Sequence, residues 1–162
     1  MRGRMRWRKM AGEIIIIEGC DKVGKTTLAA ELAKQLRWMV HKTGQPNTAA
    51  PLDEYLRVAL LEPGPFILDR FHLGQLVYGP LYRSQLPNRH RYRALELLLK
   101  ARGAILVQLT APPALLRERF QALGEDFARL EDVEKLLGMF QAAFNWSCLP
   151  KVAMDALVPT VT

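Results

Sequence analysis

The segment 19–26 (GCDKVGKT) combines glycine, lysine and threonine at spacings suited to holding phosphate groups. It fits the pattern G-x-x-x-x-G-K-[ST], with four isoleucines before it and a helical pattern after it. The glycines let successive backbone N–H groups turn toward one anion, and a helix N-terminus adds positive potential there. Lys25 is expected to reach the β- and γ-phosphates of a nucleotide, and the Thr26 hydroxyl to hold Mg²⁺. The residues expected to bind phosphate are Gly19, Cys20, Asp21, Lys22, Val23, Gly24, Lys25, Thr26 and Thr27.

A second pair of polar residues, Asp69 and Arg70, follows the short apolar run 66–68. Ligands of a parallel sheet collect at the carboxyl ends of its strands, so this pair is expected beside the phosphate-binding segment. The Asp69 carboxylate could act on Mg²⁺ or on the phosphate acceptor, and the planar Arg70 guanidinium suits a phosphate monoester. A salt bridge at a strand end is the structural alternative. Arg83 is a candidate second cation at the acceptor, with a solvated loop arginine as its alternative.

Strands and helices alternate along the sequence around these residues. Strands are predicted at 13–18, 38–41, 66–68, 104–109 and 152–157. Helices are predicted at 26–37, 51–61, about 70–78, 91–102, 113–123 and 130–145. The alternation predicts an α/β fold of three layers, α/β/α, with a five-stranded parallel sheet. Because the run 14–17 is apolar on both faces, its strand should be central, in the order 2-3-1-4-5 of the P-loop NTPase fold.

Composition favours one globular domain. The chain has 162 residues, of which 49% are hydrophobic and 24% charged, and its net charge is +7. Five of the basic residues lie in the first nine positions, and without them 18 basic residues face 16 acidic ones. We therefore expect residues 1–9 to form a disordered basic tail and residues 10–162 a single kinase-like domain, with no strong nucleic-acid surface on the domain itself. A short nucleic-acid-binding arm is the alternative for the tail.

Two further features concern location. No apolar run approaches the roughly 20 residues that a membrane-spanning helix needs, so no membrane segment is expected. Cys20 and Cys148 are too few and too far apart for a disulfide framework, which suits a reducing cytoplasm.

Two motifs resemble those of thymidylate kinases within the P-loop nucleoside and nucleotide kinases. The segment 17–27 (IEGCDKVGKTT) is similar to that family's EG-x-D-x-x-GK(S/T)T loop. The segment 69–79 (DRFHLGQLVYG) is similar to its DRY-x-x-S-x-x-A-Y-Q signature, and keeps Asp69, Arg70, an aromatic residue and Tyr78. Gly74, Val77 and Gly79 replace the family's Ser, Ala and Gln. The resemblance spans about 13–126 and is greatest for the compact deoxynucleoside monophosphate kinases encoded by bacterial viruses.

This resemblance implies ATP- and Mg²⁺-dependent phosphoryl transfer to a deoxynucleoside monophosphate, with dTMP as the first acceptor to consider. Lys22, Lys25, Asp69 and Arg70 would be catalytic, and Thr26 and Asp69 would hold the metal. Arg119 would stack on the adenine of ATP. The residues implied at the acceptor are Asp21, Gln45, Asp69, Arg70, Tyr78 and Arg83.

The acceptor side departs from the family pattern. Gln45-Pro46 stands where the family has Arg-Glu-Pro, and Lys42 is the nearest cation. The short span between the second and third strands lacks the family's base-stacking Phe and neighbouring Arg. Tyr55 or Tyr78 could stack on a base, or belong to the core. The choice of base therefore stays open.

The family places its extra catalytic cation either in the phosphate-binding loop or in a mobile lid. Here Lys22 follows Asp21 in the loop, whereas the lid candidate 119–127 has Leu123 where the family often has Arg. We therefore expect Lys22 to supply the additional charge, with a solvent-directed lysine as the alternative.

Two other functions are compatible with the sequence. A deoxynucleoside kinase, acting on a 5′-hydroxyl, would use a carboxylate after the first strand, where Glu18 stands. A kinase-like nucleic-acid-binding protein would use the arginine-rich tail. A homodimer is also left open.

Overall fold

The central position of the isoleucine-rich strand is confirmed. In the computed structural model, which describes residues 7, 9–43, 51–126 and 128–156, β1 (Ile14–Glu18) lies between β3 (Phe66–Asp69) and β4 (Ile105–Thr110). The edges are β2 (Met39–Lys42) and β5 (Lys151–Asp155), which gives the order β2-β3-β1-β4-β5 with every pair parallel. All five residues of β1 are buried, because helices cover both faces of the sheet.

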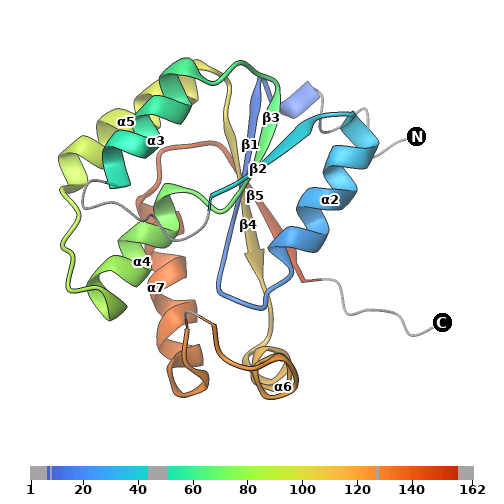
Figure 1. Cartoon of the computed structure of the whole chain (residues 1–162), viewed down its shortest axis with the longest axis vertical. Helices are drawn as coiled ribbons and strands as arrows, with labels where there is room; N and C mark the ends of the chain where they lie inside the picture. Colours follow the sequence, from blue (N-terminus) through green and yellow to red (C-terminus); the bar gives the residue numbers. More distant parts are fainter. Residues whose placement is uncertain (1–6, 8, 44–50, 127, 157–162) are drawn as a thin grey trace.

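The helices form two unequal layers (Figure 1). One side of the sheet carries α2 (Lys25–Leu36), and the other carries α3 (Pro51–Leu61), α4 (His72–Tyr82), α5 (Arg89–Ala101) and α7 (Val133–Trp146). α6 (Pro113–Leu123) and the short 3₁₀ helix η1 (Leu130–Asp132) join β4 to α7 beyond the end of the strand. None of the helices in the described ranges is long and apolar enough to cross a membrane.

Several helix boundaries differ from the sequence prediction, among them the start of α7 at Val133 instead of 130, and two of the differences have a local cause. α4 was predicted to stop near 78, before Gly79 and Pro80, but it continues to Tyr82. The helix continues past Pro80. The turn that contains this proline is completed by a hydrogen bond from the Arg83 N–H to the Gly79 carbonyl, at 3.1 Å. α5 begins at Arg89, two residues before the predicted start, because the Asn88 side chain caps the first turn by accepting two backbone N–H groups.

Part of the expected tail belongs to the folded body. Trp7 packs against the hydrophobic core, and its carbonyl accepts a hydrogen bond from the Ala11 N–H at 2.9 Å. Trp7 thus contacts the domain although it precedes the predicted boundary after residue 9. Residues 1–6 and 8 lie outside the described residues, and so do the arginines on which the nucleic-acid alternative depends.

A buried polar cluster fastens α4, α5 and the end of α7 together. Its centre is Glu96, which is fully buried, and its other members are His72, Arg93, Ser147 and Cys148. The His72 Nε2 lies 2.9 Å from Glu96 Oε1, and the Ser147 hydroxyl donates to the same oxygen at 2.6 Å. Burial alone would raise the pKa of Glu96, but the hydrogen bonds and the neighbouring His72 together lower it to about 2. We call this group the Glu96 cluster.

Candidate active site

The phosphate-binding loop leaves β1 through a turn that requires glycine. Gly19 has φ 156°, and a Cβ at this position would lie 2.4 Å from the Leu109 carbonyl oxygen of the neighbouring strand. Gly24 precedes α2 in the left-handed region, at φ 106°. The loop can therefore follow this path only with the two glycines of the motif, which explains their spacing.

Lys25 points back into the loop. Its ammonium donates to the carbonyl oxygens of Gly19 and Cys20, at 2.8 and 2.6 Å, and the residue is 4% exposed. Burial and then the charge of Arg70 lower the pKa of Lys25 to about 8. A buried ammonium next to a second cation favours an anionic ligand at this loop.

Thr26 and Asp69, the two residues expected to hold a metal, are in direct contact. Pairing of β1 with β3 sets Ile17 opposite Asp69, and the Thr26 hydroxyl donates to Asp69 Oδ2 at 2.7 Å. Asp69 is 1% exposed, and its Oδ1 has no hydrogen-bond partner among the residues that the structure describes. An unpartnered carboxylate oxygen beside a hydroxyl fits Mg²⁺.

The described residues contain no group of three or more His, Cys, Asp or Glu side chains placed to hold a metal. Thr26 and Asp69 would therefore be a sparse protein ligand set. Such a set is usual for Mg²⁺, which keeps several waters and binds the phosphates of its nucleotide.

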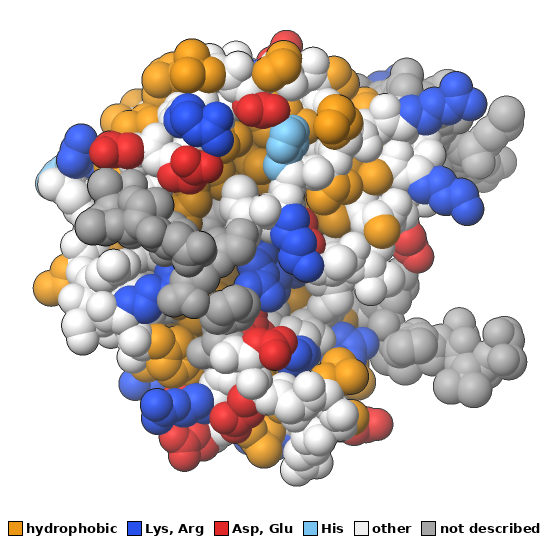
Figure 2. Space-filling view, viewed as in Figure 1, with side chains coloured by type: hydrophobic (Ala, Val, Ile, Leu, Met, Phe, Trp, Pro, Cys, Tyr) orange, Lys and Arg blue, Asp and Glu red, His pale blue; other side chains and the backbone are white. Residues whose placement is uncertain are grey.

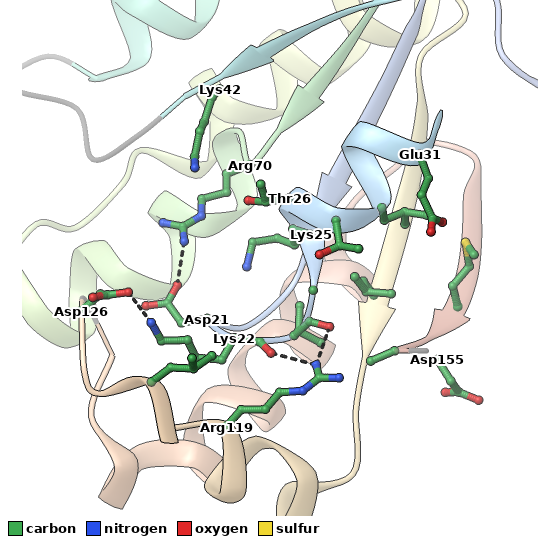
Figure 3. Close-up of a pocket in the computed structure, with 18 residues that line it drawn as sticks. Asp21, Lys22, Lys25, Thr26, Glu31, Lys42, Arg70, Arg119, Asp126 and Asp155 are labelled. Carbon is green, nitrogen blue, oxygen red and sulfur yellow. Dashed lines mark hydrogen bonds and ion pairs between the residues drawn. The ribbon is translucent and has the colours of Figure 1, made fainter. Parts of the chain in front are cut away.

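Asp21 connects the loop to Arg70 and Tyr78. Its Oδ1 lies 3.3 Å from Arg70 Nη2 and accepts from the Tyr78 hydroxyl at 3.2 Å, while its backbone N–H donates to that hydroxyl at 3.1 Å. Arg70 has a left-handed backbone, with φ 69°, which costs about 1–2 kcal/mol for a residue with a side chain. This conformation turns the guanidinium from the end of β3 toward the loop (Figure 3).

Lys22 and Arg119 join the loop to the segment after α6. Lys22, also left-handed at φ 62°, forms an ion pair with Asp126. Arg119 Nη1 donates to the carbonyl oxygens of Lys22 and Val23, at 2.9 and 3.2 Å. Arg119, which the resemblance places at the adenine of ATP, thus binds the backbone of the loop in this structure.

Most of the side chains described above line one cavity of about 480 Å³, whereas the buried Asp69 and Tyr78 are not among its lining residues. Basic side chains gather near the middle of the face in Figure 2, and Figure 3 shows how they point into the cavity. Its basic lining residues are Lys22, Lys25, Lys42, Arg70 and Arg119, and its acidic ones are Asp21, Glu31, Asp126 and Asp155. Glu31 and Asp155 belong to no motif of the sequence, and Asp126 lies in the lid candidate 119–127, where no role was expected of it.

Of the other predicted acceptor residues, Arg83 and Tyr78 do not line the cavity. Gln45 is outside the described residues. The Arg83 guanidinium donates to Gln75 Oε1 at 2.5 Å. Tyr78 and Tyr55 are both buried, at 6% and 3% exposed, so each belongs to the core in this structure.

Glu18 serves as a cap for α4. Its Oε1 accepts the backbone N–H groups of Phe71, Leu73 and Gly74, at 2.9, 2.9 and 3.3 Å. Burial raises the pKa of this carboxyl above its ordinary value, against the lowering effect of His72 and the backbone donors. Its main observable role is to fix the start of the helix that follows Arg70.

Comparisons with known proteins support this architecture. No family model matches the chain. It is 27% identical over 146 residues to the SPβ prophage-derived uncharacterized protein YorR of Bacillus subtilis strain 168, covering 88% of each chain. The crystal structure of YorR in complex with phosphorylated GDP matches with a TM-score of 0.76 and 26% identity, over 88% of this chain and 85% of that one.

More distant structures share the fold alone. Deoxyadenosine kinase from M. mycoides with bound dCTP matches with a TM-score of 0.61 and 16% identity, over 91% of this chain and 92% of that one. Polyphosphate kinase 2 from Arthrobacter aurescens TC1 matches with a TM-score of 0.65 and 13% identity, over 92% of this chain and 63% of that one. The resemblance to thymidylate kinases in particular stays a prediction, but the chain has the fold of the P-loop kinases.

Proposed function

We propose that this chain is a kinase that transfers a phosphoryl group from ATP to a deoxynucleoside monophosphate. The observation that carries the proposal is the placement of Arg70. Its guanidinium lies at the phosphate-binding loop, held by the buried Asp21, in the same cavity as Lys25. A planar fork beside the loop suits a second phosphate, which a monophosphate acceptor provides and a nucleoside does not.

The residues divide the work of transfer between donor and acceptor. Lys25 and the N–H groups of the loop would bind the donor phosphates, and Arg70 would bind the acceptor phosphate. Thr26 and Asp69 would hold Mg²⁺, which supplies charge neutralisation on the phosphates. Lys22 would add positive charge where the transferred group's oxygens lie. Catalysis of this kind is mostly positioning and electrostatic stabilisation.

The relatives are consistent with a nucleotide substrate. YorR was crystallised with phosphorylated GDP, and the M. mycoides deoxyadenosine kinase with dCTP and with dATP. The motif resemblance makes dTMP the first acceptor to test, and the guanine nucleotide of YorR makes dGMP the second.

A deoxynucleoside kinase is the competing candidate, and Glu18 is the observation that favours it. A carboxyl with a raised pKa suits a general base at a 5′-hydroxyl. Against this, one Glu18 oxygen already accepts three backbone N–H groups at the start of α4.

A substrate panel separates the two functions. Purified protein is incubated with γ-labelled ATP, Mg²⁺ and either the four deoxynucleoside monophosphates or the matching nucleosides, with the Lys25→Ala variant as the inactive control. Labelled diphosphate with at least one monophosphate is expected. Label in nucleosides alone would assign the deoxynucleoside kinase activity, and label in neither set would refute both functions.

A further inference from the structure

The ion pair between Lys22 and Asp126 joins the phosphate-binding loop to the segment that follows α6. The Lys22 side chain is 14% exposed and lies on the cavity wall, whereas the Asp126 side chain is 61% exposed. The Lys22 hydrogen bond and charge hold the pKa of Asp126 below its usual value. The carboxylate therefore stays ionised at neutral pH and keeps its attraction for the ammonium.

Lys22 is constrained at its backbone as well as at its ammonium. Its backbone is left-handed, with φ 62°, and Arg119 Nη1 donates to its carbonyl oxygen at 2.9 Å. The Lys22 ammonium donates a hydrogen bond to the Asp126 carboxylate, and this contact holds the ammonium in place. An ammonium has three N–H donors, so one bond to Asp126 leaves two directions for phosphoryl oxygens.

The segment that carries Asp126 is attached to the site without the help of its side chain. The Ala128 N–H donates to Asp21 Oδ2 at 3.1 Å, and the Arg129 N–H donates to the Tyr82 hydroxyl at 3.2 Å. Replacing the Asp126 carboxylate should thus leave the path of the segment intact. The Asp126 end of the pair is 61% exposed, so removing this carboxylate should cost little stability and should not unfold the protein.

We propose that Asp126 is a positioning residue, which holds the Lys22 ammonium at the phosphate site so that it meets the charge of the transferring phosphoryl group. This proposal rests on the proposed function. Its effect belongs to the transition state, because orientation of a cation toward developing charge changes turnover more than donor binding. The alternative is that Asp126 withholds Lys22 from the phosphates, in which case removal of the carboxylate would accelerate the reaction.

The decisive variant is Asp126→Asn, which removes the charge and nearly keeps the shape. We expect kcat to fall about tenfold with the KM for ATP changed less than about twofold, as for loss of an interaction specific to the transition state. Asp126→Glu keeps the charge and should recover most of the activity. Glu125→Gln is the matched control, because Glu125 is an adjacent acid whose carboxylate accepts from the Leu130 N–H instead.

A double-variant cycle distinguishes positioning from a general effect on the fold. If Asp126 acts through Lys22, Asp126→Asn should add no further loss in a Lys22→Gly background. Equal losses in both backgrounds, or an Asp126→Asn enzyme with unchanged or increased kcat, would overturn the proposal. If the unmodified chain phosphorylates no acceptor, the proposed function fails, and the same cycle is measured on the slow hydrolysis of ATP by water, where the same losses are expected.

Discussion

The phosphate site and the Glu96 cluster differ in how completely their buried charged groups are hydrogen-bonded. Both carboxylate oxygens of Glu96 have partners, from α4, α5 and the residues that follow α7. In the phosphate site, Asp69 Oδ1 has no partner within the described part of the chain, and Arg70 lies close enough to Lys25 to lower the pKa of that lysine. A buried charge with all its partners holds elements together, and one with an incomplete set favours a ligand. The comparison predicts that substitutions will separate cleanly into those that affect catalysis and those that affect folding.

The largest effect on catalysis should come from Lys25→Ala. We expect kcat/KM to fall by a factor on the order of 10³ or more, because the main cation for the donor phosphates is lost. The free energy of unfolding should stay equal or rise, since a buried ammonium no longer has to be desolvated. Steady-state assays and urea denaturation measure the two quantities.

The control for Lys25→Ala is Lys34→Ala, the same change at an exposed position of the same helix. If Lys25→Ala destabilised the protein strongly and Lys34→Ala did not, the contrast between the two clusters would fail on its first test.

Lys22→Gly should lower kcat by about 10²–10³, with a small effect on the KM for ATP. Glycine suits the left-handed backbone at this position, so the loop itself should keep its shape. Leu123 is exposed and lines the cavity, and Leu123→Arg in the same chain should restore part of the activity. Near-normal turnover of Lys22→Gly would direct attention to Arg117, Arg119 or Arg129.

Arg70→Ala should raise the KM for the monophosphate by about 10- to 100-fold, as expected for loss of a charge-assisted hydrogen bond. The KM for ATP should change much less, because we propose that Lys25 and the loop, and not Arg70, bind the donor. Arg70→Lys retains the charge without the planar fork, so its KM for the monophosphate should lie between those of the unmodified enzyme and of Arg70→Ala. An Arg70→Ala enzyme with unaltered acceptor KM and kcat would contradict the assignment.

The smallest effect on catalysis should come from Glu96→Gln, which should instead cost about 3 kcal/mol of unfolding free energy. The pKa of Glu96 is about 2 in the folded protein, against an ordinary value of 4.5. Its stabilisation is therefore complete above about pH 4.5 and declines as the pH falls toward 2. Denaturation at pH 7, 4 and 3 should show that Glu96→Gln removes this decline, whereas Glu118→Gln, on the exposed surface, keeps it. If kcat of the folded Glu96→Gln variant changed by more than about twofold, the Glu96 cluster would also affect catalysis, and the proposed separation of the two regions would be wrong.

The parts of the structure that the sequence predicted are those specified by local patterns. The loop 19–26 is a continuous motif, and the five strands follow from short apolar runs, so the order of the sheet and a position of Asp69 near the loop were predictable. The Glu96 cluster was not, because Glu96 and Ser147 are 51 positions apart and meet only after α5 and α7 pack. Likewise Asp126 reaches Lys22 across 104 positions, and no spacing rule connects them.

The proximity of Lys25 and Arg70 has a consequence for finding ligands. Lys25 and Arg70 repel each other in the free protein and lower its stability. A polyanion that binds between them should remove this repulsion and stabilise the folded protein. A melting-temperature screen with pyrophosphate, tripolyphosphate and nucleotides should therefore report binding before any acceptor is known. A ligand at 100 times its Kd adds about 2.7 kcal/mol, or about 5–10 °C for a chain of this size. Binding of an anion near Lys25 and Arg70 can thus be detected as a rise in the melting temperature.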